Sequence, residues 1–297
     1  MLKLIDVNKS FGEVKALNGM SLHAKKGSVY GIIGPNGAGK STAVRHMAGI
    51  YRQDSGQVLV GGEPVFENTE IKSKIAYVPD DVFCFPMATT QDMMQYYKSF
   101  YPNFRTERFE KLRELFDFDI KRPMRKLSRG MKKQAGFWLA FSMMPEVLIL
   151  DEPVDGMDPV VRRSVWRLAL QDVAERGTTM IVASHNLREL EDVCDTVGII
   201  EKGKMLHECR LDEMQENVVK IQLAYESERE LPPELHVLNI SQSGKVKTLI
   251  VKGGTERATE LLKSTNPLFM DVLNMSLEEI FIYELGGAGY EVKDIIL

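Results

Sequence analysis

The run Gly34-Pro-Asn-Gly-Ala-Gly39-Lys40-Ser41-Thr42 fits the pattern G-x-x-x-x-G-K-[ST] and constrains the fold more than any other part of the sequence. It follows a short apolar run, Val29–Ile33, and precedes a segment with helical patterning, Ala43–Ile50. A strand, a glycine-rich loop and a helix in this order form the context in which the pattern binds phosphate. The loop therefore predicts an α/β core.

The residue types in this loop suit ATP together with Mg²⁺. Its glycines let backbone N–H groups curl round phosphates, and the following helix adds the partial positive charge of its amino terminus. Lys40 should reach the β- and γ-phosphates, while the Ser41 hydroxyl should ligate Mg²⁺. A glycine-rich turn without a ligand is the structural alternative, but four matched positions arise by chance in about one chain in a hundred. The expected ATP-binding residues of the loop are Gly34, Asn36, Gly37, Ala38, Gly39, Lys40, Ser41 and Thr42.

Two further apolar runs end in polar residues. Val147–Leu150 closes on Asp151 and Glu152, and Thr179–Ala183 is followed by Ser184 and then His185. In parallel α/β sheets, buried strands are continuous apolar stretches and ligands bind beyond their carboxyl ends, so these side chains could converge on one crevice. We expect Asp151 to hold Mg²⁺ and Glu152 to polarise the attacking water. Without the phosphate loop, this acidic pair would equally fit a strand-ending turn.

Composition narrows the class of protein. With 297 residues, 44% of them hydrophobic and 27% charged, the chain fits one large or two unequal globular domains. Its 38 basic and 42 acidic residues give a net charge of −4, which offers no broad attraction for nucleic acid. Three scattered cysteines predict neither a disulfide framework nor a zinc site and fit a reducing cytosol. No stretch has the roughly 18 apolar residues of a membrane-spanning helix, so work on a membrane requires a partner.

The chain is expected to form two domains. We place the nucleotide-binding domain at 1–216, with a helical insert at about 80–140 that is rich in aromatic residues and methionines, and a small α+β domain at 217–297. We expect more than half of the aromatic and methionine side chains to form the core of the insert and a subset to face outward. The elements expected in the second domain are strands at Val218–Tyr225, Leu235–Ile240 and Val246–Val251, a helix at Glu256–Lys263, and an amphipathic stretch at Leu277–Tyr283.

The segment Leu127-Ser128-Arg129-Gly130-Met131 precedes Val147-Leu-Ile-Leu-Asp151-Glu152-Pro153 at a spacing that resembles the ATPase subunit of an ATP-binding-cassette (ABC) transporter. The similarity extends over about residues 1–225. It implies a phosphate-loop NTPase core with a mixed or parallel sheet, an antiparallel β subdomain, a helical insert and here a small C-terminal α+β domain. It also implies that Ser128 and Gly130 contact the γ-phosphate held by a second subunit, so that two copies form each active site.

Three other positions match the family in order. Phe11 lies where the family places an aromatic residue that stacks on adenine, although an isolated Phe is more often part of a core. Asp158, in Val154-Asp-Gly-Met-Asp158, matches the acidic residue of the loop that crosses the dimer interface. His185 matches the switch histidine, which contacts the γ-phosphate and couples it to closure of the dimer. The resemblance thus implies that Glu152, His185 and Lys40 are catalytic.

The sequence departs from the family pattern at two places. Asp80 follows Tyr77-Val78-Pro79, where the family commonly has Gln that touches Mg²⁺ and water. Because a carboxylate is also an oxygen ligand, we expect Asp80 to keep a metal-linked role beside Ser41 and Asp151. In the signature, Arg129 and Met131 replace the commoner Gly and Gln, but the two residues expected to touch phosphate are kept.

The resemblance also implies partners and a location. We expect a homodimer or a heterodimer with a second ABC ATPase subunit, and an integral-membrane permease that docks on the helical insert. The segment Met275-Ser-Leu-Glu-Glu-Ile-Phe281 is similar to a closing segment of bacterial exporter ATPases that serve type-two permeases, and Tyr77-Val-Pro-Asp-Asp81 with a short tail domain is similar to the YtrB-like branch. The tail is expected to support a homodimer. The expected location is cytoplasmic, peripheral on the inner face of the cell membrane.

Two other functions fit parts of the same sequence. A soluble ABC-type ATPase that acts on DNA, ribosomes or cluster assembly would fit the same nucleotide site, but the chain has one cassette, no coiled-coil insertion and no conspicuous basic patch. A phosphate-loop kinase would leave Ser128, Gly130 and His185 without a role. No nucleic acid partner is expected.

Overall fold

The structure is a computed structural model in which the chain forms two compact units. The first contains Met1–His185 and Val193–Glu208, and the second contains Asn186–Asp192 and the described residues from Cys209 on. The boundary drawn from the sequence, after residue 216, lies later in the chain. The structure describes residues 1–85, 87–116, 118–213, 218–226, 229–276, 278–280 and 283.

A central sheet of buried strands organises the first unit. Within this sheet, neighbouring strands pair in parallel from β9 through β3, β8 and β7 to β6, as the continuous apolar runs of the sequence predict. Every residue of β3, β7 and β8 is buried. The carboxyl ends of these three strands therefore lie at the same edge of the sheet. In spatial order the strands are β10 (Lys204–Arg210), β9 (Thr196–Glu201), β3 (Val29–Ile33), β8 (Thr179–Ser184), β7 (Val147–Asp151) and β6 (Ile75–Val78).

An antiparallel sheet forms the second layer of this unit, which confirms the expected antiparallel β subdomain. One hydrophobic core joins it to the central sheet. Leu2 and Met20 belong to the same cluster as Val44 of helix α1 (Lys40–Met47) and as Ile149 and Ile181 of the central strands. Burial of such aliphatic side chains is the main favourable contribution to folding. In spatial order its strands are β2 (Val14–Ala24), β1 (Leu2–Phe11), β4 (Ser55–Val60) and β5 (Glu63–Pro64).

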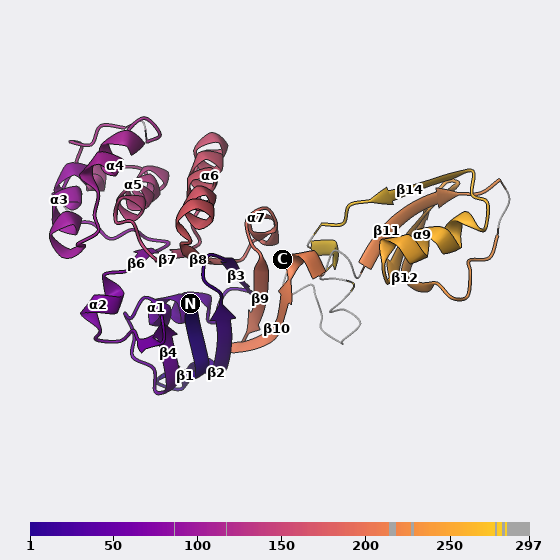
Figure 1. Ribbon diagram of the computed structural model, residues 1–297, viewed down its shortest axis with the longest axis horizontal. Coiled ribbons are helices and arrows are strands. Elements are labelled where there is room, and N and C mark those ends of the chain that lie inside the picture. The colour runs from indigo at the N-terminus through magenta and orange to yellow at the C-terminus, as the bar shows by residue number, and fades with distance from the viewer. Residues whose placement is uncertain are drawn as a thin grey trace. The chain divides into compact units, whose positions relative to one another are not determined.

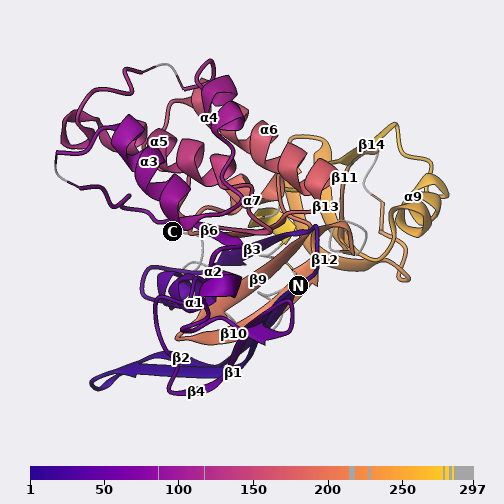
Figure 2. The ribbon, with the colours of Figure 1, turned by 60° about the vertical axis from the view of Figure 1, so that its left-hand side comes forward.

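The helices α3, α4 and α5 gather at one end of the first unit, and β1, β2 and β4 lie at the other (Figures 1 and 2). The indole of Trp138 on α5 stacks on Phe109 of α4 with ring centroids 4.5 Å apart and donates a hydrogen bond to the Phe109 carbonyl at 2.7 Å. This aromatic core confirms the helical insert. The helices of the unit are α1 (Lys40–Met47), α2 (Thr69–Lys72), α3 (Thr90–Phe100), α4 (Thr106–Leu112), the 3-10 turn η1 (Met124–Lys126), α5 (Arg129–Ser142) and α6 (Pro159–Arg176).

The aromatic and methionine residues of the insert are more exposed than the sequence suggested. Met93, Met94 and Phe104 are buried. Of the ten aromatic and methionine residues between Phe83 and Phe104, five are exposed, so the expectation that more than half of them form the core is wrong. Helix α3 explains the difference, since Thr90, Met93 and Met94 bury one face while its other face remains open. The exposed members are Phe83, Phe85, Met87, Tyr96 and Phe100.

The second unit is built on an antiparallel sheet with one helix packed on it. Ala258 and Leu262 of α9 pack with Ile221 and Leu249 of the sheet. The sequence anticipated three of its strands and the helix but missed β14, and Leu277, Phe281 and Ile282 of the expected terminal stretch lie outside the described residues. Its elements are β12 (His236–Ser243), β13 (Val246–Lys252), β11 (Val218–Ala224) and β14 (Phe269–Leu273) in spatial order, with α7 (Leu187–Glu191) and α9 (Thr255–Lys263). Within the described part of both units, no helix has the length and apolar character needed to cross a membrane.

Candidate active site

The loop after β3 bends sharply into α1. Gly39 adopts φ 106°, in the left-handed region that favours glycine, and a Cβ there would approach the Ala16 carbonyl oxygen to 2.6 Å. Helix α1 starts at Lys40, earlier than the expected Ala43, because Gly39 serves as its N-cap. The first-turn N–H groups of Lys40, Ser41 and Thr42 are thus presented at the end of the loop, which is the arrangement that binds anions.

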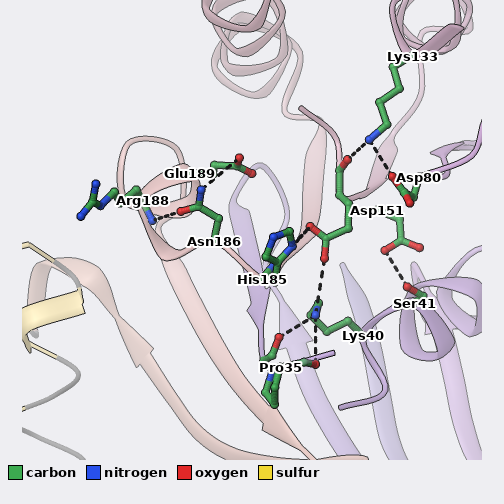
Figure 3. Close-up of polar contacts among 12 residues, drawn as sticks. Pro35, Lys40, Ser41, Asp80, Lys133, Asp151, His185, Asn186, Arg188 and Glu189 are labelled. Atoms are coloured by element: carbon green, nitrogen blue, oxygen red, sulfur yellow. Dashed lines mark hydrogen bonds and ion pairs between the residues drawn. The ribbon is translucent and has the colours of Figure 1, made fainter. Parts of the chain in front are cut away.

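The Lys40 side chain lies under this loop and is only 6% exposed. Its Nζ donates hydrogen bonds to the carbonyl oxygens of Gly34 at 2.7 Å and Pro35 at 3.3 Å, and it lies 3.6 Å from Oε1 of Glu152 (Figure 3). An ammonium held by these oxygens is a fixed positive charge beside the loop. It connects the end of β3 with the end of β7.

Ser41 and Asp151 bring two oxygen donors together. The Ser41 hydroxyl donates to Oδ1 of Asp151 at 3.1 Å, and the Tyr77 hydroxyl donates to the other carboxylate oxygen at 3.4 Å. Burial, and then the negative charge of Glu152, raise the pKa of Asp151, against the effect of the Ser41 hydrogen bond. A divalent cation would favour the ionised carboxylate, and oxygen donors are what Mg²⁺ prefers. The donor set therefore fits the expected metal.

Glu152 is fixed through both its backbone and its side chain. It has φ 46°, which is uncommon for a residue with a side chain, and its N–H donates to the Ala183 carbonyl at 2.9 Å. Its Oε2 lies 2.8 Å from Nδ1 of His185 and accepts the His185 backbone N–H at 3.3 Å. The ends of β7 and β8 thus converge on one site, as their polar terminal residues predicted. Figure 3 shows His185 and Lys40 directed to the same carboxylate.

Asp80, for which we expected a metal-linked role, forms ion pairs with the signature segment in this structure. Its Oδ1 accepts hydrogen bonds from Arg129 at 2.7 Å and from Lys133 at 2.9 Å. Burial alone would raise the pKa of Asp80, but its bonds to Lys133 and Arg129 outweigh burial and hold the pKa below its usual value. Asp80 thus lies beside two cations, Lys133 and Arg129. Arg129 occupies the signature position at which Gly is commoner in the family.

The signature segment begins helix α5. Ser128 is its N-cap, and its hydroxyl accepts the N–H of Met131 at 3.2 Å. Gly130 lies against the loop after β7, where a Cβ would come within 2.5 Å of the Gly156 carbonyl oxygen. Ser128 is exposed and Gly130 is buried. Only glycine permits this close approach of α5 to the loop that carries Asp158.

The two remaining predicted residues lie on the surface. The Phe11 ring is 45% exposed and makes an edge contact with Tyr51 at 5.4 Å between centroids, with the Lys9 ammonium 5.5 Å from its face. Asp158 is the exposed N-cap of α6, and its Oδ1 accepts the Val160 N–H at 2.8 Å. Each is accessible to a ligand or partner.

Two residues at the site were not anticipated. Lys133 is 1% exposed, and its Nζ donates a short hydrogen bond to the Glu152 carbonyl oxygen as well as bonding Asp80. Asp155 offers a carboxylate oxygen that lies within 4.8 Å of ligand atoms of both Glu152 and His185. The spacing of Arg129 and Lys133 by four residues, which puts both on one face of a helix, was the available signal for the lysine.

Comparison with known proteins gives concordant results. A family model described as ABC transporter matches residues 17–155. The ABC transporter ATP-binding protein YtrB of Bacillus subtilis (strain 168) is 31% identical over 97% of this chain and 99% of its own length. Linearmycin resistance ATP-binding protein LnrL of the same organism is 33% identical over 69% of this chain and 68% of its own length. A solved dimeric ATP-binding cassette in a post-hydrolysis state, bound to ADP and Pi, has a TM-score of 0.65 at 21% identity, over 71% of this chain and 99% of that one. At 21% identity, this structural similarity shows the fold alone.

Proposed function

The chain belongs to the ABC transporter family, in which it is an ATP-binding subunit that hydrolyses ATP, and from this premise we propose the roles of its site residues and the kind of transport that it drives. The observation that carries the proposal is the meeting of four side chains, Lys40, Asp151, Glu152 and His185, beside the phosphate loop. Asp151 and Glu152 come from the end of β7, His185 follows β8, and Lys40 begins α1, the helix after β3.

The loop binds the ATP phosphates through its first-turn N–H groups and the Lys40 ammonium. In the nucleotide-bound protein, the Lys40 ammonium would donate to phosphate oxygens in place of the Gly34 and Pro35 carbonyls. Because hydrogen bonds to a charged acceptor are about twice as strong as those to a neutral one, this exchange favours binding. The other loop residues named above, among them Asn36, Ala38 and Thr42, line the same phosphate path. Phe11 offers its exposed ring to adenine.

Ser41 and Asp151 would hold Mg²⁺, which supplies charge neutralisation at the phosphates. Asp80 remains a proposed third member of this set. Its exposed fraction, 43%, leaves the carboxylate accessible, although its present partners are Arg129 and Lys133. An unchanged Mg²⁺ requirement in Asp80→Ala would remove it from the metal site.

Glu152 is the proposed general base. Its carboxylate is 14% exposed and lies between Nδ1 of His185 and the Lys40 ammonium, so it is oriented from two sides. A base held in this way accepts the proton of the attacking water while His185 remains in contact with the γ-phosphate side of the site.

Glu152→Gln keeps the shape and removes the base, so we expect turnover to fall about 100-fold or more while ATP still binds. The matched control is Glu146→Gln, an exposed glutamate just before β7. Steady-state phosphate release measures turnover, and equilibrium titration with a fluorescent ATP analogue measures binding. Undiminished turnover in Glu152→Gln would remove Glu152 as the base.

Each site is proposed to be completed by a second subunit, homologous or identical. Ser128 is exposed at the amino terminus of α5, where N–H groups favour an anion, and Gly130 lies beside it. Asp158 lies exposed on the loop that contacts Gly130. These features present an anion-binding face for the γ-phosphate held by the partner subunit.

We propose that the exposed aromatic patch receives the permease. Phe83, Phe85, Tyr96 and Phe100 are linked by ring contacts with centroids 4.8–5.4 Å apart, and Met87 is 66% exposed. Aromatic and methionine side chains suit an adaptable groove for an amphipathic helix. The permease would hold the subunit at the inner face of the membrane.

Because a relative is named for linearmycin resistance, export is the proposed direction.

Co-purification of the full chain with a polytopic membrane protein, and its loss in Phe85→Ser/Phe100→Ser, tests this docking surface. Capture of ribosomes or DNA in place of a membrane protein would favour the alternative, a soluble ABC-type ATPase that acts on a macromolecule.

The second unit is proposed to support dimerisation. A truncation after Glu216 that dimerises as well as the full chain would argue against that role.

A further inference from the structure

Helix α5 contacts the loop after β7 at two points in the same chain. Near its start, Gly130 allows close approach to the Gly156 carbonyl. One turn later, the Lys133 ammonium donates to the Glu152 carbonyl oxygen. The two contacts lie at different points of the loop, at Gly156 and at Glu152. The helix that begins with the signature segment therefore also contacts the residue proposed as the base.

Lys133 is unusual for a lysine, because only 1% of its surface is exposed. Lysine is almost never fully buried unless it is paired. Here the charge is balanced by Asp80, whose Oδ1 lies 2.9 Å from Nζ, and Arg129 binds the same oxygen at 2.7 Å. The ammonium is therefore fixed by an anion on one side and the main chain of Glu152 on the other, as Figure 3 shows.

The backbone of Glu152 needs such support. Its φ of 46° is uncommon for a residue with a side chain, and conformations of this kind persist where surrounding contacts hold them. Its N–H is held by Ala183 and its carbonyl by Lys133. Because the carbonyl contact fixes the peptide plane after Glu152, it also fixes the direction in which the side chain leaves the backbone.

We propose that Lys133 is a positioning residue for Glu152: its ammonium, neutralised by Asp80, holds the Glu152 main chain in the conformation that directs the carboxylate toward His185 and the phosphate loop. This inference rests on the proposed role of Glu152 as the base. Among the described residues, Lys133 makes no polar contact with the phosphate loop, and of the residues proposed to hold Mg²⁺ it contacts Asp80 but neither Ser41 nor Asp151. We therefore expect it to act on turnover and not on nucleotide affinity.

The test uses Lys133→Met in the full chain. This change removes the ammonium but leaves Asp80 paired with the 61%-exposed Arg129, so no charge becomes stranded. We expect kcat to fall about 10- to 100-fold, the range that a small misplacement of a catalytic group costs, with KM for ATP unchanged within about twofold. The matched control is Lys132→Met, since Lys132 is the adjacent lysine of α5 and makes no ion pair among the described residues.

A double variant separates positioning from a general loss of structure. If Lys133 acts through Glu152, adding Lys133→Met to Glu152→Gln does not lower the residual single-turnover rate further. The same factor of loss in both backgrounds, or a kcat for Lys133→Met equal to that of Lys132→Met, would overturn the proposal. If Lys133→Met fails to fold, Lys133→Leu, which also lacks a donor for the carbonyl, replaces it in the same comparison. Full turnover in Glu152→Gln would instead overturn the proposed base, whatever the lysine variants do.

Discussion

Replacing Asp80 by asparagine should destabilise the first unit, because it leaves the buried Lys133 ammonium without its counter-charge. Breaking a fully buried ion pair from one side costs about 3–5 kcal/mol, and an exposed pair is worth about 0–1 kcal/mol. In this pair Lys133 is 1% exposed and Asp80 is 43% exposed, which places the expected cost between these limits, at about 2 kcal/mol. For a unit of this size, that cost corresponds to a fall in Tm of about 4–8 °C.

Scanning calorimetry of the nucleotide-free chain measures this shift, with Asp81→Asn as the matched control on the neighbouring exposed aspartate. Adding Lys133→Met to Asp80→Asn removes the stranded charge and should restore most of the lost stability, whereas Arg129 can turn to solvent in either variant. A Tm for Asp80→Asn within about 1 °C of the wild type, or a double variant less stable than the single one, would refute this reasoning.

Two further changes test other parts of the account. Phe11→Ala should weaken ATP binding about fivefold, as the loss of about 1 kcal/mol of stacking predicts, and an unchanged Kd in the titration would remove Phe11 from the adenine site. In the second unit, Lys220 lies 2.6 Å from Glu279. Burial acts to raise the pKa of Glu279, but the hydrogen bonds that it accepts from Lys220 and from the Ser276 N–H lower this pKa below its usual 4.5. The stabilisation from this lowered pKa is therefore present above pH 4.5 and is lost as pH falls through the folded value. Glu279→Gln should cost about 0.5–1 kcal/mol at neutral pH and progressively less in acid. A difference in unfolding free energy that stays constant from pH 7 to pH 3 would contradict the pairing.

The parts of the fold that were predictable are those in which local chemistry and burial agree. The strands β3, β7 and β8 are buried throughout and mostly apolar because both faces of a parallel sheet are covered, and polar residues stand at or just beyond the carboxyl end of β7 and β8. By contrast, β14 has the mixed burial of an edge strand, with Phe269 exposed and no regular alternation, so it had no clear pattern to recognise.

The site shows the same limit at the level of single residues. The phosphate loop, Asp151 and Glu152 stand at strand ends and could be placed from the sequence. Lys133 could not, because its spacing of four residues from Arg129 shows only that both share one helix face. The packing of α5 on the loop after β7 buries Lys133 and leaves Lys132 half-exposed. The helical start at Lys40 was likewise set by the backbone of Gly39, which hydrophobic patterning does not report.

The central claim is that each ATP site is shared between two subunits, and cross-linking tests it most directly. In a Glu152→Gln background with Cys84, Cys194 and Cys209 replaced by serine, one chain would carry Asn36→Cys and the other Met131→Cys, and a short bismaleimide would join them. We predict that ATP with Mg²⁺ produces a covalent product of about twice the 33.6 kDa chain mass, and that ADP does not. The account would be contradicted if saturating ATP gave no cross-linked product, or if the product formed equally without nucleotide.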